Sequence, residues 1–487
     1  MPCVDLSASH LPRVSVSNLP FRPRKEGTVR PNKPVGRKLD YQPGLVSTKA
    51  PEIRPFHAKA LVDLVAKSIQ SHEPADRLLG DFFRANKGCG SSDRRLIAET
   101  VYGVLRHAGR LSTVLSWPVR WDGTTAGLAE PKTLVSCYLI TVLGVEPRDM
   151  IEPLPFLSKD RLNASLGEMA KVVEESAEWL SVSSSLPLWL ATRWVAEMGY
   201  AEAKAVADSL LVPAPLTIRT NTLKGDRKAL MQWLELEGLA PEPCRLSPDA
   251  ISLERRLNLF EMKAFADGFF EVQDEGSQLI AQMAKPKPGQ LVVDGCAGGG
   301  GKTLQMAAMM ENKGMLYALD THERRLADLP KRTRRAGVHN VRTQAIGSNR
   351  GREVTKLFGK ADVVLVDAPC SGSGVLRRNP DSRWKLGEER VTELVALQRT
   401  ILEGYVPMLK VGGRLVYATC SLLQEENEEQ VAWLLAAHPN LQLVKASEHF
   451  AQHGLKEAAA AVGDTMQLRP HRHGTDGFFA AIVERTA

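Results

Sequence analysis

The stretch LVVDGCAGGGGKT, residues 291–303, decides the fold of the C-terminal half of the chain. Its first three residues are apolar and typical of a short buried strand, and helical spacing begins at Thr303. The glycines between them let backbone N–H groups approach a ligand closely, and the following helix offers its positive N-terminus. The sequence therefore predicts a strand, a glycine-rich ligand loop and a helix.

Short β-rich runs alternate with helical stretches over the rest of this half. Strands are predicted at 315–319, 341–346, 363–366, 414–417 and 478–483, and helices at 303–310, 389–408 and 425–435. Such alternation predicts an α/β fold with a doubly wound, mostly parallel sheet, in which ligands bind beyond the carboxyl ends of the strands. The residues that follow each strand are therefore the candidates for a functional site.

The second predicted strand ends in a carboxylate, Asp320. It lies about twenty residues after the glycine run, where Rossmann-like folds place the acid that binds ribose hydroxyls. This position favours a nucleoside-containing ligand, either NAD or S-adenosylmethionine. The loop ends in Gly301-Lys302-Thr303, which also fits the end of a Walker A phosphate loop. That motif requires a second glycine five residues before Gly301, and this chain has Cys296 there. A P-loop nucleotide hydrolase therefore stays open as an alternative.

Two cysteines follow neighbouring predicted strands. Asp367-Ala368-Pro369-Cys370 comes after the fourth strand and Ala418-Thr419-Cys420 after the fifth. A single cysteine at a strand end is usually a small buried apolar residue, but two at adjacent strand ends, one in a Pro/Gly/Ser loop, indicate reactive thiols. The seven cysteines of the chain include no C-x-x-C pair, so we expect neither a disulfide scaffold nor a metal site.

These motifs resemble those of the RNA (cytosine-5) methyltransferase family, in its small-subunit ribosomal-RNA methyltransferase B (RsmB-like) branch. The resemblance covers the chain from about residue 185 to its end, and a fainter one relates the helical segment, best at 93–111, to NusB-like RNA-binding domains. The matching stretches are 219–222, 272–278, 296–303, Asp320, 367–370, 377–381 and 417–421.

The resemblance implies S-adenosylmethionine as the methyl donor, a Rossmann-like methyltransferase domain and RNA as the partner, most simply small-subunit ribosomal RNA. It makes Cys420 the nucleophile at cytosine C6, Cys370 the group that assists proton removal and release, and Asp367 a hydrogen-bond partner of the cytosine edge. The residues that it assigns to the cofactor are Cys296, Ala297, Gly298, Gly299, Gly300, Gly301, Lys302, Asp320 and Asp367.

Two positions depart from the family pattern. Gly298-Gly299 stands where the family has Ala-Pro, and no acid occurs near Ile346-Gly347-Ser348, where the family has a carboxylate that contacts adenosine. A looser loop and a missing contact predict weakened cofactor affinity without loss of a catalytic group. A catalytically silent RNA-binding assembly factor is therefore a second alternative.

Composition divides the chain into four parts: a disordered basic tail at 1–50, a helical NusB-like RNA-binding domain at 51–165, a linker and small α+β RNA-binding module at 166–285, and the catalytic domain at 286–487. The net charge of +7 is uneven, because the tail alone carries +6 and segment 324–360 carries +9. No apolar run is long enough to span a bilayer, and no signal sequence opens the chain. We therefore expect a cytoplasmic monomer that binds RNA phosphates.

Overall fold

The computed structural model describes residues 50–254, 259–347 and 352–487. The predicted basic tail lies, apart from residue 50, outside these described residues.

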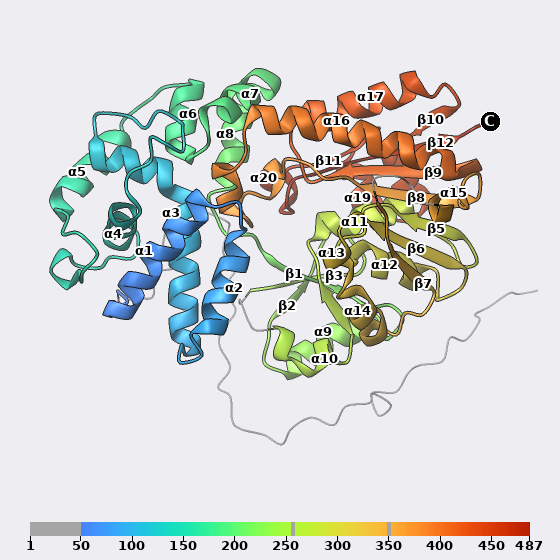
Figure 1. Ribbon diagram of the computed structural model, residues 1–487, viewed down its shortest axis with the longest axis horizontal. Helices are drawn as coiled ribbons and strands as arrows, with labels where there is room; N and C mark the ends of the chain where they lie inside the picture. Colours follow the sequence, from blue (N-terminus) through green and yellow to red (C-terminus); the bar gives the residue numbers. More distant parts are fainter. Residues whose placement is uncertain (1–49, 255–258, 348–351) are drawn as a thin grey trace, which may run out of the picture.

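The N-terminal region is all helical, as predicted, and forms a separate layer at the left of Figure 1. Its longest helix, α3, is packed on both sides by the others, and its core includes Leu61, Ile97, Leu105 and Leu134. The helices are α1 Pro55–Gln70, α2 Ala75–Ala85, α3 Ser91–Ser116, α4 Pro131–Thr141 and α5 Lys159–Met169.

Three more helices follow where a linker was expected, so the prediction of a linker there is wrong. They are α6 Ala177–Ser184, α7 Leu188–Met198 and α8 Tyr200–Ser209. The polar residues around Ser176 act as a helix start, because the Ser176 hydroxyl accepts a hydrogen bond from the Trp179 N–H at 3.0 Å. Leu180 and Trp194 are fully buried in a cluster that also contains Leu376 and Val391 of the C-terminal region, so these helices connect the two halves of the molecule.

A small α+β module comes next, as predicted. Its antiparallel sheet has the order β2-β3-β1-β4 and is covered by α9. The elements are β1 Leu216–Thr220, α9 Arg227–Leu236, β2 Pro241–Pro243, β3 Ala250–Leu253, α10 Lys263–Ala266 and β4 Phe270–Val272.

The C-terminal region is the predicted doubly wound domain. Its sheet has the order β10-β12-β9-β8-β5-β6-β7, in which β5 to β9 are parallel and β12 runs antiparallel beside β9. The strands are β5 Leu291–Asp294, β6 Met315–Asp320, β7 Val341–Ala345, β8 Ala361–Asp367, β9 Leu409–Thr419, β10 Leu441–Val444, β11 Met466–Leu468 and β12 Phe478–Arg485. The helices are α11 Glu275–Ala284, α12 Gly301–Met309, α13 Glu323–Leu326, α14 Leu329–Ala336, α15 Arg352–Thr355, α16 Glu388–Tyr405, α17 Glu428–Ala437, α18 Ala446–Gln452, α19 Lys456–Ala461 and α20 Pro470–His473.

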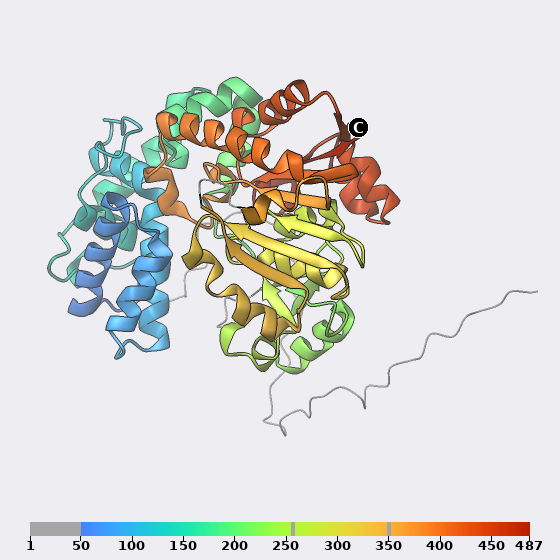
Figure 2. The same cartoon turned by 45° about the vertical axis from the view of Figure 1, so that its right-hand side comes forward.

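Helices cover both faces of this sheet (Figure 2). Val293, Val364 and Tyr417 point to the face packed by α16 and α17, whereas Val292 and Leu365 point to the face packed by α11 and α12. Alternate residues of each strand are thus buried on opposite sides, which explains why these strands read as continuous apolar runs. Helix α11 was expected in the small module, but its buried residues belong to this core. The four-part division of the chain stays a prediction.

The helical region is attached to the catalytic domain through the segment that follows Cys370. Arg383 is buried and donates hydrogen bonds to the carbonyls of Arg106 at 2.9 Å and Ser185 at 3.2 Å. Trp384 donates its indole N–H to the Leu105 carbonyl at 2.9 Å and packs within the helical core. Burial lowers the pKa of Arg383 to about 9. The two regions therefore share buried polar contacts and not merely a covalent connection.

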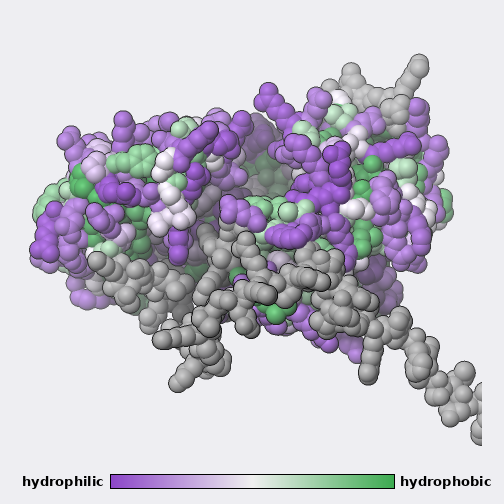
Figure 3. Space-filling view, turned by 90° about the horizontal axis from the view of Figure 1, so that it is seen from below, coloured by the Kyte–Doolittle hydropathy of each residue, from purple (hydrophilic) through white to green (hydrophobic). Residues whose placement is uncertain are grey.

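Charged and polar side chains cover most of the described surface seen from below in Figure 3. Within residues 50–254, 259–347 and 352–487, none of the helices combines the length and the apolar character that crossing a bilayer requires.

Replacing Arg383 by Met is expected to lower the free energy of unfolding by about 3 kcal/mol, because several buried carbonyls lose their donor. Urea denaturation followed by circular dichroism measures this loss. The control is Arg390→Met, at an exposed side chain of α16 whose described partner is Glu393. This substitution is expected to change stability by less than about 0.5 kcal/mol. Equal stabilities of the two variants would contradict the interpretation of Arg383 as a structural connection.

Candidate active site

The predicted site residues converge at one edge of the large sheet. Strands β5, β6 and β8 end in Asp294, Asp320 and Asp367, and Cys420 directly follows β9. Because these strands are parallel, their carboxyl ends share an edge, and the glycine loop that leads into α12 lies there as well.

The two thiols are neighbours. Cys370 Sγ and Cys420 Sγ lie 3.4 Å apart without a disulfide bond, and the Cys420 backbone N–H donates to Cys370 Sγ at 3.3 Å. Both side chains are partly exposed. The hydrogen bond with Cys420 raises the pKa of Cys370 well above its ordinary value, and burial adds to the increase. The pair can therefore hold one proton and one negative charge more readily than two charges.

Asp367 is held by the lysine of the glycine loop. Lys302 Nζ lies 2.6 Å from Asp367 Oδ2, and both side chains are mostly shielded from solvent. Burial alone lowers the pKa of Lys302, but the Asp367 carboxylate outweighs this effect and raises it above its ordinary value. A permanent positive charge thus stands beside the carboxylate at the mouth of the site.

This arrangement argues against a Walker A loop. In such a loop the lysine reaches nucleotide phosphates and the following hydroxyl binds magnesium. Here Lys302 pairs with Asp367, and the buried Thr303 hydroxyl donates to Asp294 Oδ2 at 2.7 Å. Both side chains point to the carboxylates of the sheet.

The glycine loop is fixed by Asp320 and open on its other side. The Gly298 N–H donates to Asp320 Oδ2 at 2.9 Å, and the His322 N–H donates to Oδ1 at 2.8 Å. Gly298 has a φ of +52°, which glycine adopts without strain. The loop is open at Gly298 and Gly301, where an added Cβ atom would meet no other atom within 4 Å, and closed at Gly300, where it would clash with the Leu329 side chain.

Asp294 was not among the predicted site residues. It is buried, burial raises its pKa to about 7, and its Oδ1 has no hydrogen-bond partner among the described residues. Its position at the end of the first strand was the only signal in the sequence. An open glycine cradle, a carboxylate at the end of β6 and an unsatisfied buried acceptor together fit a nucleoside ligand with an amino-acid part, as S-adenosylmethionine is.

Two further residues beside Cys370 were missed. Glu426 accepts a hydrogen bond from the Ser371 N–H at 2.8 Å, and Gln398 donates to the Pro369 carbonyl at 3.0 Å. Gln398 lies on α16 and Glu426 just before α17, far in sequence from the Cys370 loop. No local sequence pattern connects them to the thiol.

The upstream motifs act as connections and not as site residues. Arg219 of β1 donates to the Gly301 carbonyl and to Gln273 Oε1, both at 2.8 Å. Asn221 donates to the Ala336 carbonyl at 2.8 Å. These buried contacts fix the small module against the glycine loop and α14.

The two described residues that follow β7 are Ile346 and Gly347, neither of which is an acid. The Ile346 N–H donates to the Asp320 carbonyl at 2.9 Å and Gly347 follows, whereas Ser348 lies outside the described residues. Among the residues that the structure describes, no group of three or more His, Cys, Asp or Glu side chains is placed to hold a metal ion.

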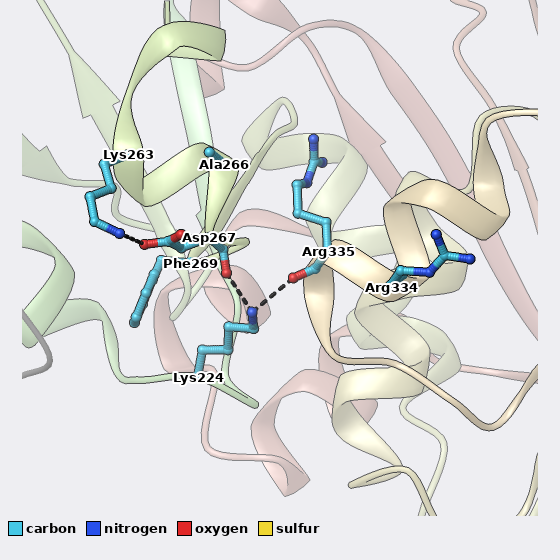
Figure 4. A pocket seen from close by; sticks show the side chains of 7 residues that line it. All are labelled: Lys224, Lys263, Ala266, Asp267, Phe269, Arg334 and Arg335. Atoms are coloured by element: carbon cyan, nitrogen blue, oxygen red, sulfur yellow. Dashed lines mark hydrogen bonds and ion pairs between the residues drawn. The ribbon is translucent and has the colours of Figure 1, made fainter.

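A basic cavity of about 570 Å³ lies between the small module and α14 (Figure 4). Lys263 approaches it from α10, whereas Arg334 and Arg335 approach it from α14. Lys224 bridges the two sides by donating to the carbonyls of Asp267 and Arg335. The cavity is lined by Lys224, Lys263, Ala266, Asp267, Phe269, Arg334 and Arg335. Four cations and one carboxylate make it a candidate contact for an anion such as a nucleic-acid phosphate.

Comparison with known proteins identifies two matching family models and several relatives. The family described as 16S rRNA methyltransferase RsmB/F matches residues 281–484, and the ferredoxin-like domain of RsmF/B-like methyltransferases matches residues 186–259. A solved structure of a methyltransferase homolog protein from Pyrococcus horikoshii is 28% identical, with a TM-score of 0.55, over 64% of this chain and 100% of that one.

Curated relatives extend the match over most of the chain. The probable ribosomal RNA small subunit methyltransferase B of Synechocystis is 31% identical over 88% of this chain and 99% of its own length. The ribosomal RNA small subunit methyltransferase B of Serratia proteamaculans is 32% identical over 81% of this chain and 91% of its own length. With its paired thiols, its glycine loop and these relatives, the chain belongs to the RsmB/F methyltransferase family, in its methyltransferase B branch.

Proposed function

We propose that the protein transfers a methyl group to C5 of a cytosine in small-subunit ribosomal RNA, through a covalent bond between Cys420 and C6 of the base. The observation that carries this proposal is the pair of thiols 3.4 Å apart beside the Asp367 carboxylate. Membership of the family makes the chain an S-adenosylmethionine-dependent methyltransferase, and the proposal adds the atom that is methylated, the RNA and the covalent step.

Two thiols suit this reaction because cytosine C5 is a weak nucleophile while the ring stays aromatic. Addition of the Cys420 thiolate to C6 turns the C5–C6 unit into an enamine, whose C5 attacks the methyl group. The C5 proton then leaves, and the bond between Cys420 Sγ and C6 breaks to release the product. Cys370, in contact with Cys420, would assist proton removal and release.

Lys302 and Asp367 support the first step. Asp367 would hydrogen-bond the cytosine edge, while the Lys302 charge keeps the carboxylate in place and favours a thiolate at Cys420. A target base that is stacked in RNA must turn out of its stack to reach this edge of the sheet.

The cofactor site supports the same reaction. S-adenosylmethionine supplies an electrophilic methyl group when bound. Residues Cys296 to Lys302 would surround its methionine part, and Asp320 would bind its ribose, since the Asp320 carboxylate already lies against Gly298.

The RNA substrate is supported by the relatives, which are named ribosomal RNA methyltransferases, and by the basic cavity of Figure 4. A silent assembly factor would need the cations but not two adjacent thiols. The expectations of a monomer and of a cytoplasmic location stay predictions.

Replacing Cys420 by Ala is expected to lower methyl transfer to unmodified small-subunit RNA at least a thousandfold, because the C6 nucleophile is lost. Replacing Cys370 by Ala is expected to accumulate a protein–RNA adduct that survives denaturing electrophoresis, because release is slowed. Transfer of tritiated methyl groups and gel shift measure the two effects. Cys244→Ala, in the small module, is the control, and full activity of the Cys420 variant would contradict the mechanism.

The double variant Lys263→Ala/Arg334→Ala is expected to bind RNA more weakly and to reduce the slope of log K against log salt by about 1.5, since two phosphate contacts are lost. Filter binding at several salt concentrations measures the slope. Lys204→Ala/Lys331→Ala removes the same charge outside the cavity. An unchanged slope in the first variant, or an equal change in both, would remove the cavity from the RNA-binding surface.

Affinity for S-adenosylmethionine is expected to be weaker than in relatives that have Ala-Pro in the loop and an acid after the third strand of the sheet. The reason is the freer backbone of Gly298-Gly299 and the missing carboxylate near Ile346. Calorimetric titration of this protein and of one such relative, under the same conditions, compares the dissociation constants. Equal constants would show that other contacts replace the missing ones.

A further inference from the structure

A buried clamp holds the peptide on both sides of Cys370. Glu426 Oε1 accepts hydrogen bonds from the Ser371 N–H at 2.8 Å and from Gln398 Nε2 at 3.0 Å, and Gln398 also donates to the Pro369 carbonyl. Gln430 donates to Gln398 Oε1 at 3.0 Å and so fixes the orientation of that amide. Gln398, Glu426 and Gln430 are fully buried. Cys370 is therefore presented by a rigid peptide.

The second oxygen of the Glu426 carboxylate is unusual. Glu426 Oε2 is buried and has no hydrogen-bond partner, and no ion pair involves Glu426 within the described part of the chain. A clamp alone needs only one acceptor oxygen, which a neutral amide could supply. A buried carboxyl group without a cation is costly, and holding the loop does not account for its second oxygen.

The thiol pair supplies a reason for a carboxylate at this position. When a pair of thiols 3.4 Å apart loses one proton, the remaining proton lies between two sulfurs and the negative charge can lie on either of them. The Cys420 N–H points at Cys370 Sγ and alone would favour a thiolate at Cys370. The Glu426 carboxylate, bonded to the residue after Cys370, opposes that charge.

We propose that Glu426 is a positioning residue that keeps the shared proton of the thiol pair on Cys370 and leaves the negative charge on Cys420. The neutral Cys370 then cannot compete with Cys420 as the nucleophile in the addition to C6. This assignment rests on the proposed function for its catalytic meaning, but the distribution of charge is a property of the free protein.

The electrostatics of the neighbouring groups agree with this geometry. The pKa of Cys370 is raised by its hydrogen bond with Cys420, by burial, by charge on Cys420 and, as a smaller contribution, by the Glu426 carboxylate. On the other side of the thiol pair, a negative charge on Cys420 raises the pKa of Lys302. The titratable groups around the pair are Glu426, Lys302, Asp367 and Tyr417. Asp367 is paired to Lys302. The pKa of Tyr417 is raised well above its ordinary value by burial first and then by charge on Cys370 and Glu426, so its hydroxyl stays neutral.

Alkylation by iodoacetamide tests the proposal, because only the thiolate reacts rapidly. Cleavage after Lys and Arg puts Cys370 on peptide 361–377 and Cys420 on peptide 415–445, so mass spectrometry gives an initial rate for each thiol. Rates are measured from pH 6 to 10 on the full-length protein without RNA or cofactor. In the wild type, we expect Cys420 to react at lower pH than Cys370.

The variant Glu426→Gln keeps an acceptor for the Ser371 N–H but removes the charge. In this variant we expect the ratio of the Cys420 alkylation rate to the Cys370 alkylation rate to fall about tenfold, which corresponds to a change of one pKa unit. The matched control is Glu425→Gln, which removes the same charge from a neighbouring side chain paired with Arg193, and should leave the ratio unchanged. Thermal melting confirms that each variant is folded.

An unchanged ratio in folded Glu426→Gln, or the same fall in Glu425→Gln, would overturn the proposal. The proposal would also be overturned if Cys370 of the wild-type protein reacted at lower pH than Cys420. This wild-type measurement tests the proposal even if Glu426→Gln does not fold. A normal alkylation result in a protein that fails to methylate cytosine would leave this assignment intact and overturn the proposed function instead.

Discussion

Two sulfur atoms 3.4 Å apart can share one negative charge but not hold two, and much of the site is arranged around that constraint. Cys370 and Cys420 come from segments fifty residues apart, after neighbouring parallel strands β8 and β9. Their approach depends on the register between these strands, in which Asp367 lies opposite Ala418. Lys302, paired with Asp367, lies on one side of the site, and the Glu426 carboxyl group lies on the other.

Much of the rest of the molecule is tied to this edge of the sheet. The small module is fixed to the glycine loop through Arg219, and the N-terminal helices are fixed to the segment after Cys370 through Arg383 and Trp384. Arg377 and Arg378 of that same segment both bind the buried carboxylate of Asp476. A segment that carries Cys370 at one end thus serves as a structural junction at the other. RNA held by the outer regions would meet a site whose position relative to them is set by buried hydrogen bonds and not by a flexible linker.

The sequence was sufficient where the signal was local. Apolar runs predicted β5 to β9 and β12 of the large sheet but not the short strands β10 and β11. The glycine-rich stretch 298–301 predicted the start of α12, and Asp320, Asp367, Cys370 and Cys420 all lie at the predicted edge. It failed where helix signals were read as polar linker. Ser176, which starts α6, lies in the segment where a linker was predicted. Helix α11 lies in the segment predicted as the small module, because the pattern of a short helix does not indicate which core its apolar residues join.

The sequence by itself determined the fold class and placed Asp320, Asp367, Cys370 and Cys420 at the ends of their strands, because the apolar period and the turn residues are local features of the chain. Only the tertiary structure decided which partners these residues have. Asp294 is a buried acceptor, and Lys302 forms an ion pair with Asp367. Gln398 and Glu426 form hydrogen bonds with the peptide on both sides of Cys370. These contacts join side chains from distant elements, and their energies depend on burial and distance, which no local pattern contains.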